Sequence, residues 1–157
     1  MEKVKLIRAT VSDAETIWKM QKEAFAELLK KYKDYETSPA NEPLEKTVSR
    51  LNSPFTYFYF ICVDEERVGA IRIIDKMSDD GYKRISPIFI MPAHRNNGYA
   101  QAAMRAVEVI HGARGWKLDT ILQEAGNCRL YEKMGYLKTE QAHRVNDKMT
   151  LIIYEKL

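Results

Sequence analysis

The chain has 157 residues, 45% of them hydrophobic and 30% charged, which is the size and composition of one globular domain with a substantial core. Its net charge of +3 is mildly basic, but the 25 lysines and arginines are interspersed with 22 aspartates and glutamates, whereas a duplex-binding surface needs clustered basic residues. Nucleic acid is therefore an unexpected partner, and so is a membrane, because the longest apolar run, residues 57–63, is far shorter than the ~20 residues of a spanning helix.

Alternating polarity over residues 4–9 predicts a first strand. Ser12 and Glu15 have the spacing of a capping box, which indicates a helix from there to about residue 31. Residues 32–43 contain two prolines and cannot continue that helix. A loop of this length inside a compact domain is often functional, and its carboxylates and tyrosines favour a binding role.

The middle of the chain predicts a helix and three strands. Residues 44–51 indicate a short helix with Pro43 at its first turn. Residues 55–63 and 68–76 are rich in aromatic and β-branched side chains and predict an antiparallel hairpin, followed by a turn at residues 78–81. The next strand, residues 83–91, contains Pro87, which cannot donate a ladder hydrogen bond. We expect a break or bulge there, which would free main-chain groups for a ligand.

Glycines mark the ends of the remaining elements. They predict an Ala-rich amphipathic helix over residues 98–112, a strand over 116–122, a helix over 126–133, and two closing strands over 137–145 and 149–155. The two cysteines and three histidines show no metal-ligand spacing, so no metal is expected, and Cys62 and Cys128 are expected to pack. The N-terminus shows no secretory signal, which predicts a cytoplasmic location.

The most informative stretch joins the strand ending at Met91 to the Ala-rich helix and reads Arg95-Asn96-Asn97-Gly98-Tyr99-Ala100. A glycine at such a junction lets the backbone approach a ligand, and the first helical N–H groups have no partner inside the helix. Such a turn binds phosphate. Asn97-Gly98 is also a hairpin signal, but Ala103, Met104 and Val107 recur at helical spacing and favour the helix.

The spacing Arg-x-x-Gly-x-Ala from Arg95 to Ala100 resembles the Q/R-x-x-G-x-G/A motif of the GNAT superfamily of N-acetyltransferases, which bind the pyrophosphate of acetyl-CoA there. Leu130-Tyr131-Glu132-Lys133-Met134-Gly135-Tyr136 resembles the L-Y-E-K-x-G-F/Y signature near the GNAT C-terminus, although alone it could be an amphipathic helix with a glycine cap. The two motifs and the predicted elements follow the family's order, β-α-α-β-β-β-α-β-α-β-β. The resemblance therefore implies one GNAT domain over residues 1–157, an α/β (α+β) fold with a mixed, mostly antiparallel sheet of about seven strands and about four helices.

The resemblance implies acetyl-CoA as cosubstrate. Backbone amides of Asn96 to Gln101 would bind its pyrophosphate, each charge-assisted hydrogen bond contributing ~1.5–3 kcal/mol, and Arg95 would neutralise part of the charge. Main-chain N–H groups at the broken strand would stabilise the negative oxygen that develops on the thioester. The residues expected to contact the coenzyme are Ile88, Phe89, Ile90, Met91, Arg95, Asn96, Asn97, Gly98, Tyr99, Ala100, Gln101 and Asn127.

Asn127 is included because of a departure from the family pattern. Many members carry an asparagine seven residues before the motif tyrosine that binds the pantetheine arm, and here Glu124 occupies that position. Asn127 lies one helical turn before Tyr131 and can replace the missing contact. Glu124 is then left to contact either the coenzyme or the acceptor.

The implied reaction transfers an acetyl group to a primary amine of a small molecule or peptide by direct attack in a ternary complex. Tyr131 is the predicted general acid for the departing thiolate. Asp34, Glu36 and Glu42 are candidate bases, and no spacing selects one of them. The acidic loop favours a cationic acceptor. A non-catalytic acetyl-CoA sensor and transfer of a longer acyl group are the alternatives, and the fold allows a homodimer.

Overall fold

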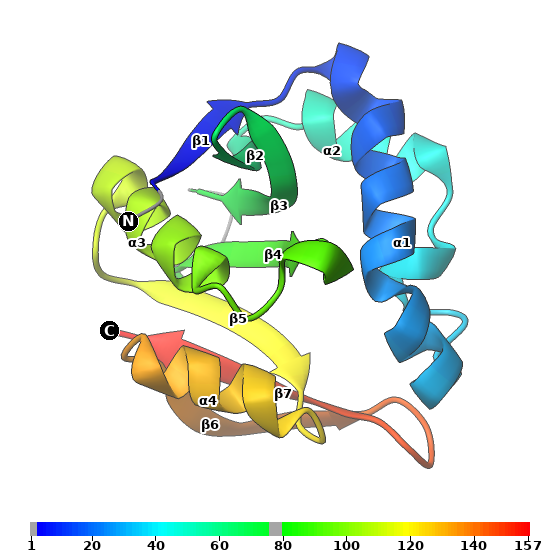
Figure 1. Cartoon of the computed structure of the whole chain (residues 1–157). Helices are drawn as coiled ribbons and strands as arrows, with labels where there is room; N and C mark the ends of the chain where they lie inside the picture. Colours follow the sequence, from blue (N-terminus) through cyan, green and yellow to red (C-terminus); the bar gives the residue numbers. More distant parts are fainter. Residues whose placement is uncertain (1–2, 76–79) are drawn as a thin grey trace.

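The computed structural model describes residues 3–75 and 80–157 and contains a seven-stranded sheet in the order β1-β2-β3-β4-β5-β7-β6 (Figure 1). Neighbouring strands are antiparallel except β4 and β5, which are parallel. The predicted mixed, mostly antiparallel sheet is confirmed. Its strands are β1 (Val4–Arg8), β2 (Thr56–Val63), β3 (Glu66–Ile74), β4 (Lys83–Ile90), β5 (Trp116–Ile121), β6 (Leu137–Arg144) and β7 (Thr150–Lys156).

Within the described residues, four α-helices pack on this sheet, and none is long and apolar enough to cross a bilayer. Helices α1 and α2 lie against one face of the β1–β4 half, α3 lies against the other, and α4 packs on the β5–β7 half (Figure 1). The α-helices are α1 (Ala14–Tyr32), α2 (Leu44–Asn52), α3 (Tyr99–His111) and α4 (Ala125–Lys133). Three connections contain the 3-10 helices η1 (Val11–Asp13), η2 (Pro39–Asn41) and η3 (Pro92–His94).

The capping box that precedes α1 is not the predicted one. The backbone N–H of Thr10 donates to Asp13 Oδ2 at 2.9 Å, so the capping contact lies at η1. Ser12 instead contacts the Thr10 hydroxyl at 2.8 Å, and Glu15 pairs with Lys19 at 3.1 Å on the first turns of α1. The predicted pairing of Ser12 with Glu15 is therefore wrong, because a 3-10 turn precedes the helix. The expected turn at residues 78–81, and the end of the strand before it at residue 76, lie partly outside the described residues.

Alternation along β2 and β3 divides the core between the two faces of the sheet. Ile61, Ile71 and Ile73 point toward α3, where they pack with Met104 and Trp116 in the larger apolar cluster. On the opposite face a second cluster packs against α1, and half-buried Cys62 lies at its edge. The members of this second cluster are Ala9, Ile17, Ala24, Phe58, Phe60, Ala70 and Phe89. Full burial of one such large apolar side chain contributes about 1.5–3 kcal/mol.

A bulge interrupts the β3–β4 ladder at the predicted place. Ile71 faces Ile88 and Ile73 faces Ile85, so Arg72 alone lies opposite the two residues 86–87. The buried Arg72 guanidinium donates from Nε to the main-chain oxygen of Ser86 and fills the space that the ladder leaves. Beyond the bulge β4 separates from β5, since the two strands pair only at Lys83–Trp116 and Arg84–Lys117.

The close approach of β3 to β4 beyond this bulge depends on Gly69. A Cβ atom there would lie 2.1 Å from the main-chain oxygen of Phe89, so backbone would have to move. We expect Gly69→Ala to lower the free energy of unfolding by about 1–3 kcal/mol in urea denaturation. Gly126→Ala is the matched control, because a Cβ in this first turn of α4 meets nothing within 4 Å and should raise stability by about 0.5–1 kcal/mol. Equal stability of Gly69→Ala and the unmodified chain would contradict the packing described.

Candidate active site

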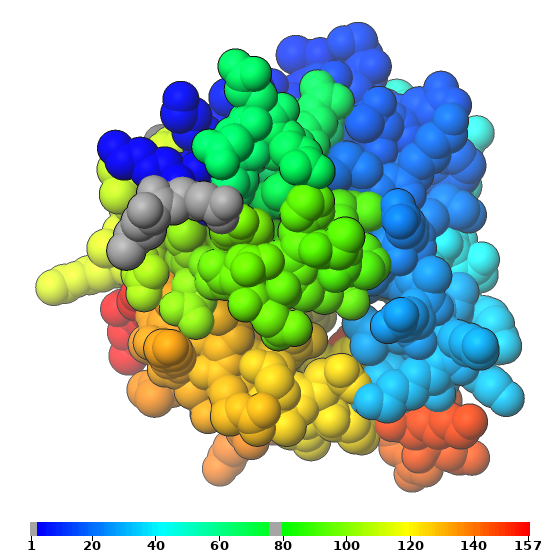
Figure 2. Space-filling view, in the orientation of Figure 1, coloured from blue at the N-terminus to red at the C-terminus, as the bar shows by residue number. Residues whose placement is uncertain are grey.

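The separation of β4 from β5 leaves an opening in the sheet, and two cavities meet there. The first, of about 470 Å³, lies among the end of β4, the β4–α3 turn, α1 and α4. The second, of about 440 Å³, lies among the α1–α2 loop, β4, β5 and β7. Figure 2 shows a hollow where the surfaces of α1, the β4–α3 turn and the β5–α4 connection meet. The two cavities share the side chains of Phe25, Leu28, Ile88, Asn127 and Tyr131.

The β4–α3 turn forms one wall of the first cavity. Gly98 is the N-cap of α3 with φ of 77°, a left-handed conformation that favours glycine, and a Cβ there would project into unoccupied space. The amides at the start of a helix have no acceptor inside the helix, and those of Gly98, Ala100 and Gln101 lie at the cavity wall. The predicted residues of this turn that line the cavity are Arg95, Asn96, Gly98, Tyr99, Ala100 and Gln101. Asn97 lies outside the lining, because its side chain turns back to the main-chain oxygens of His94 and Arg95.

Arg95 holds this turn against its neighbours. Its Nε donates to the main-chain oxygen of Ile90 at 3.0 Å and its Nη2 to that of Ala24 at 2.7 Å. These bonds join the end of β4 to α1 and fix the mouth of the cavity. The guanidinium has five N–H donors, so some remain for an anion.

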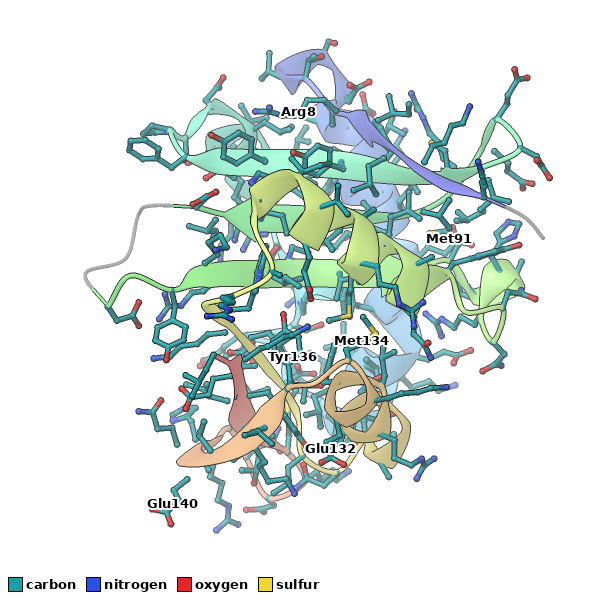
Figure 3. The ribbon with its side chains drawn as sticks, turned by 90° about the vertical axis from the view of Figure 1, so that its left-hand side faces the viewer. Arg8, Met91, Glu132, Met134, Tyr136 and Glu140 are labelled. Carbon is teal, nitrogen blue, oxygen red and sulfur yellow. The ribbon has the colours of Figure 1, made fainter. Side chains whose placement is uncertain are left out.

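The end of β4 directs some of its amides into the opening. The N–H of Met91 donates to the main-chain oxygen of Val68 at 2.7 Å, so this amide forms a hydrogen bond within the fold. Met91, which was predicted to contact the coenzyme, lies at the end of β4 outside the cavity lining (Figure 3). Antiparallel pairing alternates the direction of successive N–H groups. Those of Ile88 and Ile90 therefore point away from β3, toward the side that β5 has left. Phe89 also lines the cavity.

Tyr131 lies where the cavities meet and is only 7% exposed. Its ring packs against those of Tyr136 and Tyr154, with centroids 6.2 Å away in each case. Figure 3 shows Tyr136 between α4 and the strands. Burial, followed by the nearby Asp119 carboxyl and Cys128 thiol, raises the pKa of Tyr131 well above its usual value. The Tyr131 hydroxyl therefore remains a neutral donor over the physiological pH range. Half-buried Asn127 lies one helical turn before it.

Glu124, at the position of the usual family asparagine, connects the two halves of the molecule. Its Oε2 accepts from Lys31 Nζ at 2.7 Å and from the Tyr32 hydroxyl, and Asn146 Nδ2 donates to the main-chain oxygen of Tyr32 at 2.9 Å. Burial would raise the pKa of Glu124, but the bonds from Lys31 and Tyr32 outweigh it and hold the pKa below its usual value. Glu124 also borders the first cavity, where its carboxylate is used to fasten the end of α1.

The three candidate bases all line the second cavity in different environments. Burial would raise the pKa of Glu42, but hydrogen bonds from Arg50 at 2.8 and 3.0 Å, together with Gln21 and Lys46, lower it overall. Glu36 is exposed. Asp34 is only 5% exposed, and its Oδ1 has no hydrogen-bond partner among the residues that the structure describes. Burial raises the pKa of its carboxyl against a smaller opposing effect of its own backbone.

Asp119 also lines this cavity and was missed by the sequence reasoning. It lies on β5 just beyond the last residue paired with β4, and its neighbours Leu118 and Thr120 point into the core. The Asp119 side chain is exposed to solvent through the cavity. Desolvation by the surrounding protein raises the pKa of its carboxyl, and its own backbone and Arg84 oppose this with smaller effects. The one feature of the sequence that could have indicated Asp119 is the presence of a carboxylate within an apolar strand. Its significance depends on the separation of β4, which alternation along β5 cannot reveal.

His94 lines the first cavity, where its Nε2 lies 3.1 Å from Glu66 Oε1, whereas His111 and Cys128 have roles in packing. His111 bonds Tyr59 at 2.9 Å and Asp75 at 3.1 Å, and buried Cys128 directs its Sγ to main-chain oxygens at 3.8 and 3.9 Å. In residues 3–75 and 80–157, no group of three or more His, Cys, Asp or Glu side chains is arranged to hold a metal ion.

The sequence model of a protein family described as "Acetyltransferase (GNAT) family" matches residues 16–136, which include both cavity-lining motifs. The chain belongs to the GNAT acetyltransferase family. GNAT acetyltransferases use acetyl-CoA, and the family implies that this chain binds acetyl-CoA and an acceptor. A search of curated proteins found no match.

Solved GNAT structures show the same fold at low sequence identity. An acetyltransferase from Thermus thermophilus is 15% identical with a TM-score of 0.73, covering 98% of this chain and 97% of that one. A spermidine N-acetyltransferase chimera from Vibrio cholerae and human sequences is 15% identical with a TM-score of 0.71, covering 98% and 95%. The ribosomal protein acetyltransferase RimL, in complex with coenzyme A, is 12% identical with a TM-score of 0.70, covering 97% and 92%.

The ion pairs of Glu42 in this GNAT chain predict a pH-dependent contribution to stability. Glu42→Gln should lower the free energy of unfolding by about 1.5–3 kcal/mol at pH 7, because the hydrogen bonds from Arg50 lose their charge assistance. Since the pKa of Glu42 is lowered by folding, this stabilisation is present above the unfolded pKa of about 4.3 and is lost as the pH falls through the folded value.

Urea denaturation of both proteins between pH 7 and pH 3 measures the effect, with exposed Glu45→Gln on α2 as the control. The two stability curves should converge at the acidic end. A constant difference between them would contradict the ion-pair role of Glu42.

Proposed function

We propose that this GNAT chain acts as one domain over its whole length and transfers the acetyl group of acetyl-CoA to a primary amine of a cationic acceptor, by direct attack in a ternary complex. The observation that carries the proposal is the meeting of two cavities at Tyr131 and Asn127, where β4 and β5 no longer pair. A thioester entering through the first cavity and an amine entering through the second would come into contact at this point.

The first cavity offers the groups that a diphosphate requires. The amides at the start of α3 supply hydrogen bonds, and the positive end of the helix dipole lies in the same direction. Arg95 supplies a fixed cation beside them. Asn127, at the inner end of the cavity, is positioned to bond the amide groups of a pantetheine arm.

The reaction needs hydrogen-bond donors that stabilise the developing negative charge, and it needs two proton transfers. The amine nitrogen attacks the thioester carbon, the C–N bond forms, and the carbonyl oxygen becomes negative near the N–H groups of Ile88 and Ile90. The C–S bond then breaks and the sulfur leaves with the electron pair. Before the attack the ammonium gives one proton to Asp119, directly or through water, which frees the nitrogen lone pair. The nitrogen loses a second proton once the C–N bond has formed, and this proton passes to the departing sulfur, to which the Tyr131 hydroxyl donates a hydrogen bond.

The raised pKa of Tyr131 limits how its hydroxyl can assist the departure of the thiolate. A phenol well above its usual pKa of about 10 is a weak acid toward a thiolate whose conjugate acid lies near 8.5. Hydrogen-bond donation to the sulfur as the C–S bond breaks is thus the principal contribution, and complete transfer of the tyrosine proton is secondary.

Coenzyme binding tests the first half of the proposal. Gly98→Ala should weaken binding of coenzyme A at least ~10-fold by calorimetry, the loss expected when one charge-assisted hydrogen bond is disturbed. Gly81→Ala is the matched control, because Gly81 has nearly the same φ, 78°, and equally unoccupied surroundings but lies away from the cavities. Both variants should lose about 1–2 kcal/mol of stability from the left-handed backbone. Equal affinity in the two variants would count against the site.

Thiol release with a panel of amines tests catalysis. Tyr131→Phe should lower kcat about 10²-fold, and Asp119→Asn should lower kcat/KM by a similar factor near pH 7. The Asp119→Asn defect should shrink as the pH rises toward the amine pKa of about 10.4, because free amine then needs no base. Unchanged coenzyme affinity in both variants serves as the control. A defect of Asp119→Asn that is constant with pH would remove Asp119 from the base role.

A further inference from the structure

Among the described residues, the wall of the second cavity carries four carboxylates, Asp34, Glu36, Glu42 and Asp119, against two cationic side chains. Its two cationic residues are already paired, since Lys46 and Arg50 both bind Glu42, at 3.3 Å and 2.8 Å. In the part of the chain that the structure describes, neither Asp34 nor Asp119 forms a salt bridge. A single ammonium would leave one of these two carboxylates without a counter-charge.

Asp34 is the more unusual of the two. It is 95% buried, as its exposure of 5% shows, and its Oδ1 has no partner although it lines a cavity large enough for a ligand. Its main chain is firmly held, because its carbonyl oxygen accepts from the N–H groups of Thr37 at 3.1 Å and Ser38 at 2.8 Å. A buried carboxylate oxygen without a partner destabilises a fold, and such groups are expected where a ligand supplies the missing partner.

Asp34 and Asp119 come from different walls of the cavity, with an apolar surface between them. Asp119 and Ile121 lie two residues apart on one face of β5, roughly 7 Å along the strand. Leu151 lies directly across from Ile121, and both pack with Met149 and Tyr32, the residue two before Asp34. Moving along this wall, a ligand would meet a carboxylate beside Tyr131, then aliphatic side chains, then a second carboxylate.

We propose that the acceptor is a diamine or longer polyamine, whose reacting amine lies at Asp119 and Tyr131 and whose second ammonium binds Asp34. This inference rests on the proposed acetyl transfer and narrows its substrate class. The aliphatic chain between the two nitrogens covers Ile121, Met149 and Leu151. Asp34 acts in binding and selection, and the bond-making step takes place at the other end of the cavity.

The kinetic test compares α,ω-diamines of increasing chain length with monoamines of the same carbon number, using thiol release from acetyl-CoA. The unmodified enzyme should prefer a diamine by about 10- to 100-fold in kcat/KM, the factor that corresponds to one charge-assisted hydrogen bond. Asp34→Asn should remove this preference, so that kcat/KM for the diamine falls to the value for the monoamine of the same carbon number. Exposed Glu45→Gln on α2, outside the cavity, is the charge-matched control and should behave like the unmodified enzyme.

Thermal unfolding without ligand separates this role from a structural one. Asp34→Asn should raise the midpoint by about 2–4 °C, because the variant no longer buries a charged carboxylate in which one oxygen lacks a partner. A lowered midpoint, or equal loss with monoamines and diamines, would show that Asp34 supports the fold and would overturn the inference.

The same assays distinguish failure of the inference from failure of the proposed function. Turnover of monoamines and diamines with equal kcat/KM by the unmodified enzyme would overturn the diamine assignment alone. Absence of amine-dependent thiol release with every amine, despite tight binding of coenzyme A, would overturn the acetyl transfer and the assignment with it.

Discussion

The opening in the sheet depends on one missing set of hydrogen bonds, those between β4 and β5 beyond Arg84 and Lys117. In a continuous sheet the N–H groups of Ile88 and Ile90 would be paired with β5, and the space occupied by the two cavities would be filled. The bulge at residues 86–87, held by Arg72, turns β4 away and prevents that pairing. Main-chain donors and a passage between two cavities thus arise from a single irregularity. Their position is set by backbone geometry, so apolar side chains suffice along this part of β4.

The distribution of charge follows a division between stability and binding. Glu42 and Glu124 bind lysine, arginine, glutamine or tyrosine donors and fasten loops to helices. Within residues 3–75 and 80–157, Asp34 and Asp119 have no such partners, and desolvation raises the pKa of both carboxyl groups. The partnerless oxygen of buried Asp34 weakens the unliganded fold, whereas the Asp119 side chain is exposed to the second cavity. The proposed cationic acceptor would supply a partner to both.

Local sequence signals predicted the fold well because its elements are marked by local chemistry. Gly98, Gly112 and Gly135 adopt the left-handed backbone that their positions at helix ends require, and Pro87 lies in the bulge that it signalled. The features that the sequence did not reveal depend on distant segments. The bond from Met91 to Val68 requires the register of β3, and the exposure of Asp119 to a cavity requires the departure of β4. Neither arrangement can be inferred from residues that are close together in the sequence.

The two halves of the sheet are joined by different kinds of contact on the two sides of the opening. On one side of the opening they share a continuous apolar cluster, in which Ile85 and Met104 pack with Trp116 and Tyr136. On the other side, the end of α1 is fastened by polar contacts of Lys31, Tyr32 and Asn146, and the Lys31 side chain is 59% exposed. Dissolved electrolyte screens the exposed ion pair and leaves the apolar attachment unaffected. Ionic strength therefore weakens the attachment at the end of α1 more than the apolar attachment on the other side of the opening.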